Sequence, residues 1–187
     1  MKKIALIFPG IGYTMDRPLL YYGKKLAQNN GYDVKYVDYC ENMGARKSKI
    51  DLRATFEVKL KEAVDLLKDF QWNDYDEYLF ICKSLGTIIG AVIAEDAGIS
   101  DKVKMVMYTP VHDTFDVPLP GNAIVFTGTK DQLTENNPIT ISSLCEKYNV
   151  ECHVYEDANH SLETGDVTLD IKNMAEIMAY TGDFILK

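Results

Sequence analysis

Short apolar runs alternate with longer amphipathic segments along most of this 187-residue chain. Each run has about the length of a strand, and the segments between the runs carry apolar residues at helical spacing. Strands joined by helices pair in parallel, because each crossover returns the chain to the same edge of the sheet. The alternation therefore predicts an α/β fold, with a doubly wound, mostly parallel six-stranded sheet and helices on both faces.

The first run, Lys3 to Phe8, is continuously apolar, as expected of a strand that is covered on both faces. The other predicted strands cover residues 34–39, 78–82, 104–108, 123–126 and 151–155. Helices are predicted over 17–30, 51–70 (capped by Asp51), 85–98, 138–148 and 167–180, with a polar loop over 40–50. The sequence contains no linker, repeat or low-complexity tract, so residues 1–187 are predicted to form one domain.

Composition and charge argue against several kinds of partner. The formal net charge is −8 and the sequence pI is about 4.9, which disfavours binding to nucleic acid or to anionic membranes. The one basic cluster, Arg46, Lys47 and Lys49, is short and typical of a solvated loop. No apolar run has the length of a membrane span, and the first is too short for a signal peptide. We therefore expect a cytoplasmic protein.

The cysteines and histidines give no pattern of a metal site. The four cysteines, Cys40, Cys82, Cys145 and Cys152, form no C-x-x-C pair, and the three histidines are scattered. We expect reduced thiols, as in cytoplasmic proteins, and neither a metal nor an organic cofactor.

The segment that carries the most chemical information is the junction at Ser84, between the third predicted strand and a helix of small residues. A serine at such a junction lies on a sharp turn that lifts its hydroxyl clear of the backbone. The amide of Leu85 lies at the helix start, where N–H groups have no intrahelical partner and the dipole favours negative charge. One turn would thus supply a nucleophile and half of an oxyanion site. The alternative is that Ser84 simply caps a core helix.

The segment Cys82-Lys83-Ser84-Leu85-Gly86 resembles the nucleophile elbow of the α/β-hydrolase family, G-x-S-x-G on a strand, turn and helix. It departs from that pattern at Cys82, which replaces the first glycine. The resemblance extends in strand order over nearly the whole chain and implies a minimal α/β-hydrolase-like fold. The connection 109–122, where large lids of the family are commonly inserted, is short, so no cap domain is expected.

Polar residues follow several of the predicted strands, at the edge where ligands bind in such sheets. Ser84 follows the third strand, Asp131 the fifth and His160 the sixth, which is the α/β-hydrolase order of nucleophile, acid and histidine. An imidazole must take the serine proton, and a carboxylate must hold that imidazole in the right tautomer. We predict a catalytic triad with Ser84 as nucleophile, His160 as general base and Asp131 as its orienting carboxylate. Taken singly, Asp131 could close a turn and His160 could be solvated.

Other residues near the strand ends fit these roles less well. His112 also follows a strand but precedes the predicted acid, and His153 lies inside a strand, where a structural role is expected. Lys83 is expected in solvent or behind the site, and not as a base.

The second oxyanion donor is expected from the loop Pro9-Gly10-Ile11-Gly12 after the first strand. The family resemblance implies the amide of Ile11, with that of Gly12 as the alternative; a merely flexible glycine turn is the structural alternative. Without a lid, the cleft should be shallow and open. Residues predicted to line it for substrate binding, unless they are ordinary loop residues, are Tyr13, Met15, His112, Phe115 and Leu133.

These features predict a serine hydrolase that cleaves a small carboxylic ester or thioester through an acyl-enzyme. The same triad serves esterases, thioesterases, lactonases and amidases, and the sequence favours no oligomeric state. One alternative is a catalytically silent binding protein on the same fold. Another is a nucleotide-binding, Rossmann-like protein, since Gly10, Gly12 and Asp38 match part of the dinucleotide fingerprint; Met15, however, replaces its third glycine.

Overall fold

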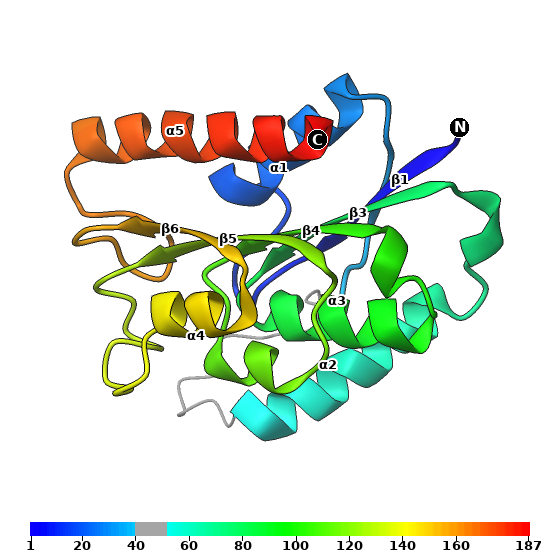
Figure 1. The fold of residues 1–187 in the computed structure, drawn as a ribbon, viewed down its shortest axis with the longest axis horizontal. Coiled ribbons are helices and arrows are strands. Elements are labelled where there is room, and N and C mark those ends of the chain that lie inside the picture. The colour runs from blue at the N-terminus through cyan, green and yellow to red at the C-terminus, as the bar shows by residue number, and fades with distance from the viewer. Residues whose placement is uncertain (40–51) are drawn as a thin grey trace.

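The computed structural model describes residues 1–39 and 52–187, which form one six-stranded sheet in the order β2-β1-β3-β4-β5-β6 (Figure 1). Every neighbouring pair of strands is parallel. The predicted α/β fold with its doubly wound parallel sheet is therefore confirmed. The strands are β1 (Lys3–Phe8), β2 (Asp33–Tyr36), β3 (Glu77–Lys83), β4 (Val103–Tyr108), β5 (Asn122–Gly128) and β6 (Glu151–Tyr155).

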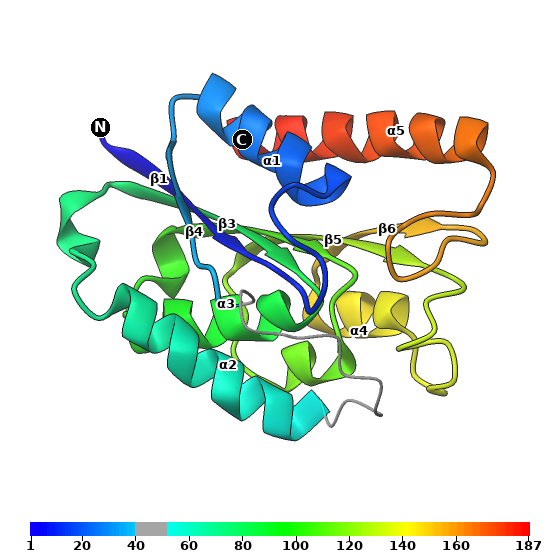
Figure 2. The ribbon, with the colours of Figure 1, turned by 180° about the vertical axis from the view of Figure 1, so that it is seen from behind.

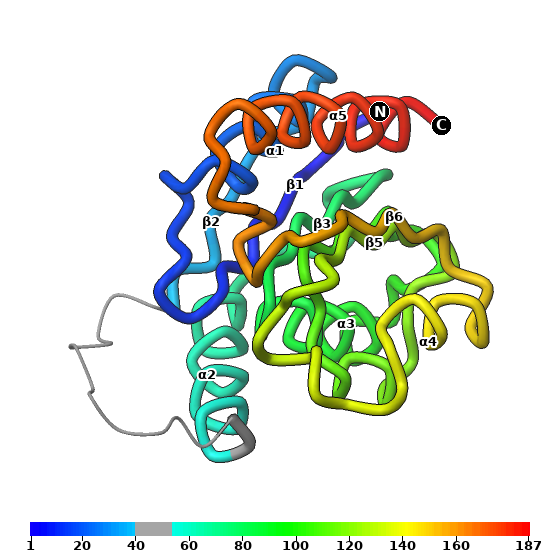
Figure 3. Tube along the Cα trace, turned by 90° about the vertical axis from the view of Figure 1, so that its left-hand side faces the viewer, coloured from blue at the N-terminus to red at the C-terminus, as the bar shows by residue number. Residues whose placement is uncertain are grey.

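Helices cover both faces of the sheet. The helices α1 (Pro18–Asn29) and α5 (Val167–Leu186) lie on one face, and α2 (Leu52–Leu67), α3 (Leu85–Asp96) and α4 (Ile141–Tyr148) lie on the other (Figure 2). The end-on view separates these three layers (Figure 3). No helix in the described ranges is both long enough and apolar enough to cross a membrane.

The core is divided by the sheet into two clusters, as the alternation of side chains along a strand requires. Along β1, Ile4, Leu6 and Phe8 enter the cluster under α2 and α3, whereas Ala5 and Ile7 enter the cluster under α1 and α5. All five are buried. The continuous apolar run in the sequence therefore reflects a strand that is packed on both faces.

Several boundaries differ from the sequence predictions. The helix α4 begins at Ile141 and not at residue 138, because the Thr140 side chain caps it by accepting a hydrogen bond from the Ser143 amide. The helix α5 continues six residues beyond 180, where Phe184 and Ile185 are buried. Three short 3-10 helices were not predicted: Trp72–Asp74, Ser100–Lys102 and His112–Asp116. The predicted loop over 40–50 and the cap at Asp51 lie outside the described residues.

The strand order reverses direction between β1 and β3, because the chain first moves outward from β1 to β2 and then returns to the other side of β1. In open parallel sheets, ligands bind outside the carboxyl ends of the strands at such a reversal. The helix α3 starts there without a connecting loop and lies directly on the end of β1. A Cβ atom at Gly86 would come within 2.3 Å of the Phe8 carbonyl oxygen, so only glycine allows this approach.

Candidate active site

Ser84 occupies the turn between β3 and α3 in a conformation that few non-glycine residues adopt, with φ 52° and ψ −122°. Its backbone is held on both sides. The Ser84 amide donates to the Tyr108 carbonyl (3.0 Å), and the Ser84 carbonyl accepts from the Thr87 amide (2.9 Å) and hydroxyl (2.7 Å). The Ser84 hydroxyl does not cap α3, which excludes the capping alternative in this structure. The backbone conformation instead presents it to the loops after β5 and β6.

Ser84, His160 and Asp131 form one chain of hydrogen-bonding contacts. The Nε2 atom of His160 lies 2.8 Å from the Ser84 Oγ, and its Nδ1 atom lies 2.7 Å from the Asp131 Oδ2. The second carboxylate oxygen, Asp131 Oδ1, accepts from the Leu133 amide (2.9 Å). The structure thus brings together three residues that are 29 and 76 positions apart.

The partners of the His160 ring favour one tautomer. A carboxylate at Nδ1 can only accept, so Nδ1 carries the proton and Nε2 is left to accept from the serine hydroxyl. Asp131 is fully buried, whereas the His160 side chain is 17% exposed. Burial lowers the pKa of His160 below 6.5; the hydrogen bond to Asp131 opposes that change, and the charge of Lys83 adds to it. The imidazole is therefore neutral at pH 7 and able to take a proton.

The loop after β1 approaches Ser84 closely. A Cβ atom at Gly10 would lie 3.1 Å from the Ser84 Cβ and 3.2 Å from the Lys83 Cγ. The loop closes with a hydrogen bond from the Tyr13 amide to the Gly10 carbonyl (3.1 Å), and Gly12 within it has φ 71°. Ile11 lies inside this turn, and Leu85 is the first residue of α3. The oxyanion roles of Ile11, Gly12 and Leu85 remain predictions on a backbone that borders the serine.

Of the two places expected for Lys83, in solvent or behind the site, the structure shows the second, because its side chain is fully buried. Its Nζ donates to the Thr109 Oγ1 (2.6 Å) and lies 5.1 Å from the centre of the Tyr13 ring. Strand alternation carried the signal: Lys83 follows Leu79 and Ile81 at a spacing of two residues, on the same buried face of β3.

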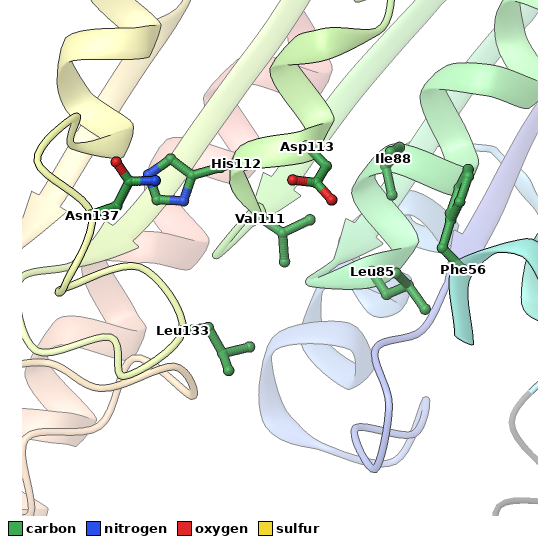
Figure 4. Close-up of a pocket in the computed structure, with 8 residues that line it drawn as sticks. All are labelled: Phe56, Leu85, Ile88, Val111, His112, Asp113, Leu133 and Asn137. Carbon is green, nitrogen blue, oxygen red and sulfur yellow. The ribbon is translucent and has the colours of Figure 1, made fainter. Parts of the chain in front are cut away.

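A pocket of about 170 Å³ lies beside Leu85, the residue that follows Ser84 (Figure 4). Leu85 and Ile88 of α3 line it together with Phe56 of α2. Val111 lies between these three residues and the polar residues of the pocket. The remaining lining residues, from the loops after β4 and β5, are His112, Asp113, Leu133 and Asn137.

Of the residues predicted to bind substrate, His112 and Leu133 line this pocket, and the other three lie elsewhere. Tyr13 is buried on the opposite face of the sheet, where its hydroxyl accepts from the Leu19 amide (3.2 Å). Met15 packs against the same cluster. Phe115 is 3% exposed and belongs to the core under α3. A pattern of loop residues could not reveal which side of the sheet each side chain would take.

Some lining residues were missed. Ile88 lies one helical turn after Leu85, so the spacing along α3 could have indicated it. Phe56 comes from a helix that is remote in sequence, and no local pattern marks it.

The other two histidines have structural partners. The Nε2 atom of His112 lies 2.7 Å from the Ile139 carbonyl oxygen, at the pocket. The His153 ring stacks between Phe126 and Tyr180, with its Nε2 3.0 Å from Glu151. Within residues 1–39 and 52–187, no three His, Cys, Asp or Glu side chains gather in a way that could hold a metal ion.

No protein-family model matches the sequence, and no curated protein matches it either. Solved structures match it closely in fold. One, from Agrobacterium tumefaciens, is a protein of unknown function that is thought to be an α/β hydrolase; it has a TM-score of 0.72 and 19% identity, over 98% of this chain and 84% of that one. The protein XC6422 from Xanthomonas campestris, an α/β serine hydrolase without a lid, has a TM-score of 0.68 and 12% identity, over 98% and 80%.

The esterase Pf2001 from Pyrococcus furiosus has a TM-score of 0.63 and 15% identity, over 98% of this chain and 82% of that one. These likenesses establish that the chain has the α/β-hydrolase fold, in its form without a lid. The predicted resemblance is thereby confirmed for the fold.

Proposed function

We propose that this protein is a serine hydrolase that cleaves small carboxylic esters or thioesters through an acyl-enzyme. The observation that carries the proposal is the chain of contacts from Ser84 Oγ through the His160 ring to the buried Asp131 carboxylate. This arrangement is the one that turns a weakly nucleophilic hydroxyl into a nucleophile. Its position at the reversal of strand order, and the esterase among the proteins of similar fold, support the same conclusion.

The reaction follows from the geometry. The Nε2 atom of His160 takes the Ser84 proton as Oγ bonds to the acyl carbon, and the carbonyl π electrons move to its oxygen. Backbone amides of Leu85 and of Ile11 or Gly12 are the proposed donors to that oxyanion. The imidazolium, stabilised by Asp131, then protonates the departing alkoxide or thiolate and leaves an acylated serine. Water repeats the sequence: His160 takes its proton, the hydroxyl adds to the acyl carbon, and the returned proton frees Ser84.

The pocket beside Leu85 is proposed to receive the acyl group. Its inner wall is apolar, from Phe56, Leu85, Ile88 and Val111, so it suits a hydrocarbon chain. Its volume of about 170 Å³ is below the roughly 300–1,000 Å³ of pockets for drug-sized ligands. We therefore propose short acyl groups as the preferred substrates. Leu133 is 46% exposed and stands at the open side, where the leaving group can depart.

Covalent labelling tests the proposal directly. A fluorophosphonate probe should label the wild-type protein at Ser84, with loss of the fluoride and no label on Ser84→Ala. The matched control is Ser161→Ala, which removes a serine beside His160 and should leave labelling unchanged. A panel of chromogenic esters from acetyl upward should then show turnover that declines with chain length.

Two results would overturn the proposal. One is a folded wild-type protein that neither takes the probe nor hydrolyses any ester of the panel. The other is equal labelling of Ser84→Ala. Either result would favour the silent binding protein on the same fold, because the contacts would then exist without chemistry.

A further inference from the structure

Lys83 is a buried cation beside the proposed active site, and the proposed reaction gives it no role. Its side chain is fully buried, and it makes no ion pair with any residue in the part of the chain that the structure describes. Burying an ammonium group without a carboxylate partner is costly. A charge buried at such a cost, one position from the proposed nucleophile, calls for a functional explanation.

The contacts of Lys83 connect the loops of the site. The Nζ atom donates to Thr109 Oγ1 (2.6 Å), and the same hydroxyl donates to the His160 carbonyl oxygen (3.1 Å). Thr109 is itself fixed, since its amide donates to the Phe126 carbonyl (2.7 Å) and its φ is 45°. Lys83 is thus tied through one hydroxyl to the backbone of the loop that carries the catalytic imidazole.

The charged and titratable groups around Lys83 come from three loops. Asp131 follows β5, His160 follows β6, and Tyr13 follows β1 and presents its ring to the ammonium group. On β4, the Tyr108 hydroxyl is engaged with Thr181 (3.0 Å). The charge of Lys83 acts on His160. That charge lowers the pKa of His160, whereas the carboxylate of Asp131 raises the pKa of Lys83.

We propose that Lys83 is a positioning residue, which fixes the His160 loop through Thr109 and whose charge opposes protonation of the resting imidazole. It does not touch substrate and is not a base. The role of Lys83 in catalysis rests on the proposed function. Its effect on the protonation of the His160 ring can be measured in a protein that turns over no substrate.

The ammonium is poised to lose its proton close to physiological pH. Burial lowers the pKa of Lys83 from 10.5 to about 7, and Asp131 opposes this change. Below that pH, the charged lysine disfavours protonation of His160 and competes with the imidazolium for Asp131. Above it, the imidazolium that forms during the reaction is no longer opposed. The two groups therefore titrate as an interacting pair.

The experiment measures the His160 ring itself. NMR titration of the histidine ring protons in wild type and Lys83→Met gives the midpoint for each of the three histidines, with His160 assigned from its absence in His160→Gln. In Lys83→Met, the His160 midpoint should rise by about 0.5–1 pH unit, while His112 and His153 stay in place. The matched control is Lys104→Met, which removes a lysine bonded to the Ile185 carbonyl at the far end of β4 and should shift none.

The positioning step is tested separately through Thr109. Thr109→Val keeps the shape of the side chain and removes the bridging hydroxyl, so kcat should fall about tenfold with KM within about twofold, as for one lost hydrogen bond. Thr109→Ser restores the hydroxyl and should restore kcat. If Lys83→Met does not fold, the neutral Lys83→Gln replaces it in the titration.

An unchanged or lowered His160 midpoint in a folded Lys83 variant would overturn the charge effect. An unchanged kcat in Thr109→Val, or no recovery in Thr109→Ser, would overturn the positioning effect. A wild-type protein without any hydrolase activity would overturn the proposed function instead, and the titration would still decide whether Lys83 controls the His160 ring.

Discussion

The two sides of Ser84 are built from adjacent positions of one strand, yet they differ in chemistry. Cys82 points under α3 and Lys83 points under α1 and α5, because successive side chains of a strand face opposite ways. Both are fully buried. The α3 side, where burial holds the Cys82 pKa well above its usual range, carries the apolar wall of the pocket. The other side holds a polar network of Lys83, Thr109 and the His160 loop.

We infer from this difference that the two sides affect different properties of the proposed reaction. On the inference drawn above, the polar side influences the protonation and position of the imidazole, since its contacts end on the His160 ring and backbone. In the proposed reaction, the apolar part of the pocket on the other side, from Phe56, Leu85, Ile88 and Val111, determines which acyl group fits. Substitutions on one side should therefore change rate and pH dependence, and substitutions on the other should change chain-length selectivity.

The largest expected effect comes from the carboxylate on the polar side. In Asp131→Asn, the amide oxygen can still accept from the Leu133 amide, so the amide nitrogen faces His160 Nδ1. The ring must then accept at Nδ1 and carry its proton on Nε2, which prevents it from taking the Ser84 proton. We expect kcat to fall about 10⁴-fold with little change in KM, measured on the best ester of the panel.

The control for that substitution is Asp157→Asn, which removes an exposed carboxylate paired with Lys130 in the neighbouring loop. It should leave kcat within about twofold, because exposed ion pairs contribute little. Similar losses in both variants would mean that general loop damage, and not the tautomer of His160, accounts for the effect.

On the polar side, most of the site could be predicted from the sequence. Ser84 directly follows β3, and Asp131 and His160 lie in the loops after β5 and β6. Because parallel strands end at one edge of the sheet, their meeting was predictable from strand order. The sequence analysis left the burial of Lys83 open, because lysine is seldom fully buried, although its place in the alternation of β3 pointed to it.

The residues that line the pocket on the apolar side were harder to predict from the sequence. Its wall includes Phe56, which reaches the pocket only because α2 packs against α3. Tyr13 was predicted there and lies on the opposite face, since its hydroxyl accepts a hydrogen bond from the start of α1. Local patterns indicate that a residue follows a strand, but long-range packing decides the side to which it turns.

The next effect in size concerns the apolar side. Ile88→Phe fills part of the pocket, whereas Ile88→Val widens it by one methyl group at the same position. Relative to an acetyl ester, kcat/KM for a longer acyl ester should fall about 10–100-fold in Ile88→Phe, because a pocket discriminates a methylene group by roughly that factor. In Ile88→Val, the same ratio should rise by a smaller factor.

The comparison of the two Ile88 variants excludes general damage. Overpacking can cost about 1–3 kcal/mol of stability, which would lower activity on every ester alike. An unchanged ratio between long and short esters in both variants would show that the acyl group lies elsewhere. The pH profile should stay unchanged in both, because Ile88 is on the opposite side of the sheet from Lys83.

The last effect is on stability, which reports the cost of the buried charge without any need for turnover. The pKa of Lys83 is about 7 in the folded protein and roughly 10.4 in an unfolded chain. Between these values the unfolded state binds more protons, so the free energy of unfolding rises with pH, by at most about 1.4 kcal/mol per pH unit for one group. Below about pH 7 both states are protonated, and the full cost of the buried charge is present.

Lys83→Met removes that cost, so its gain over wild type in free energy of unfolding should be largest at pH 6 and shrink towards pH 9. Urea unfolding at several pH values measures the difference, and Lys104→Met, which affects a lysine at the far end of β4, should show no such trend. A gain that is flat with pH would mean that Lys83 keeps one charge state throughout. Because Cys82, the adjacent buried residue, stays neutral over this range, a pH-dependent gain would come from the polar side of Ser84 alone.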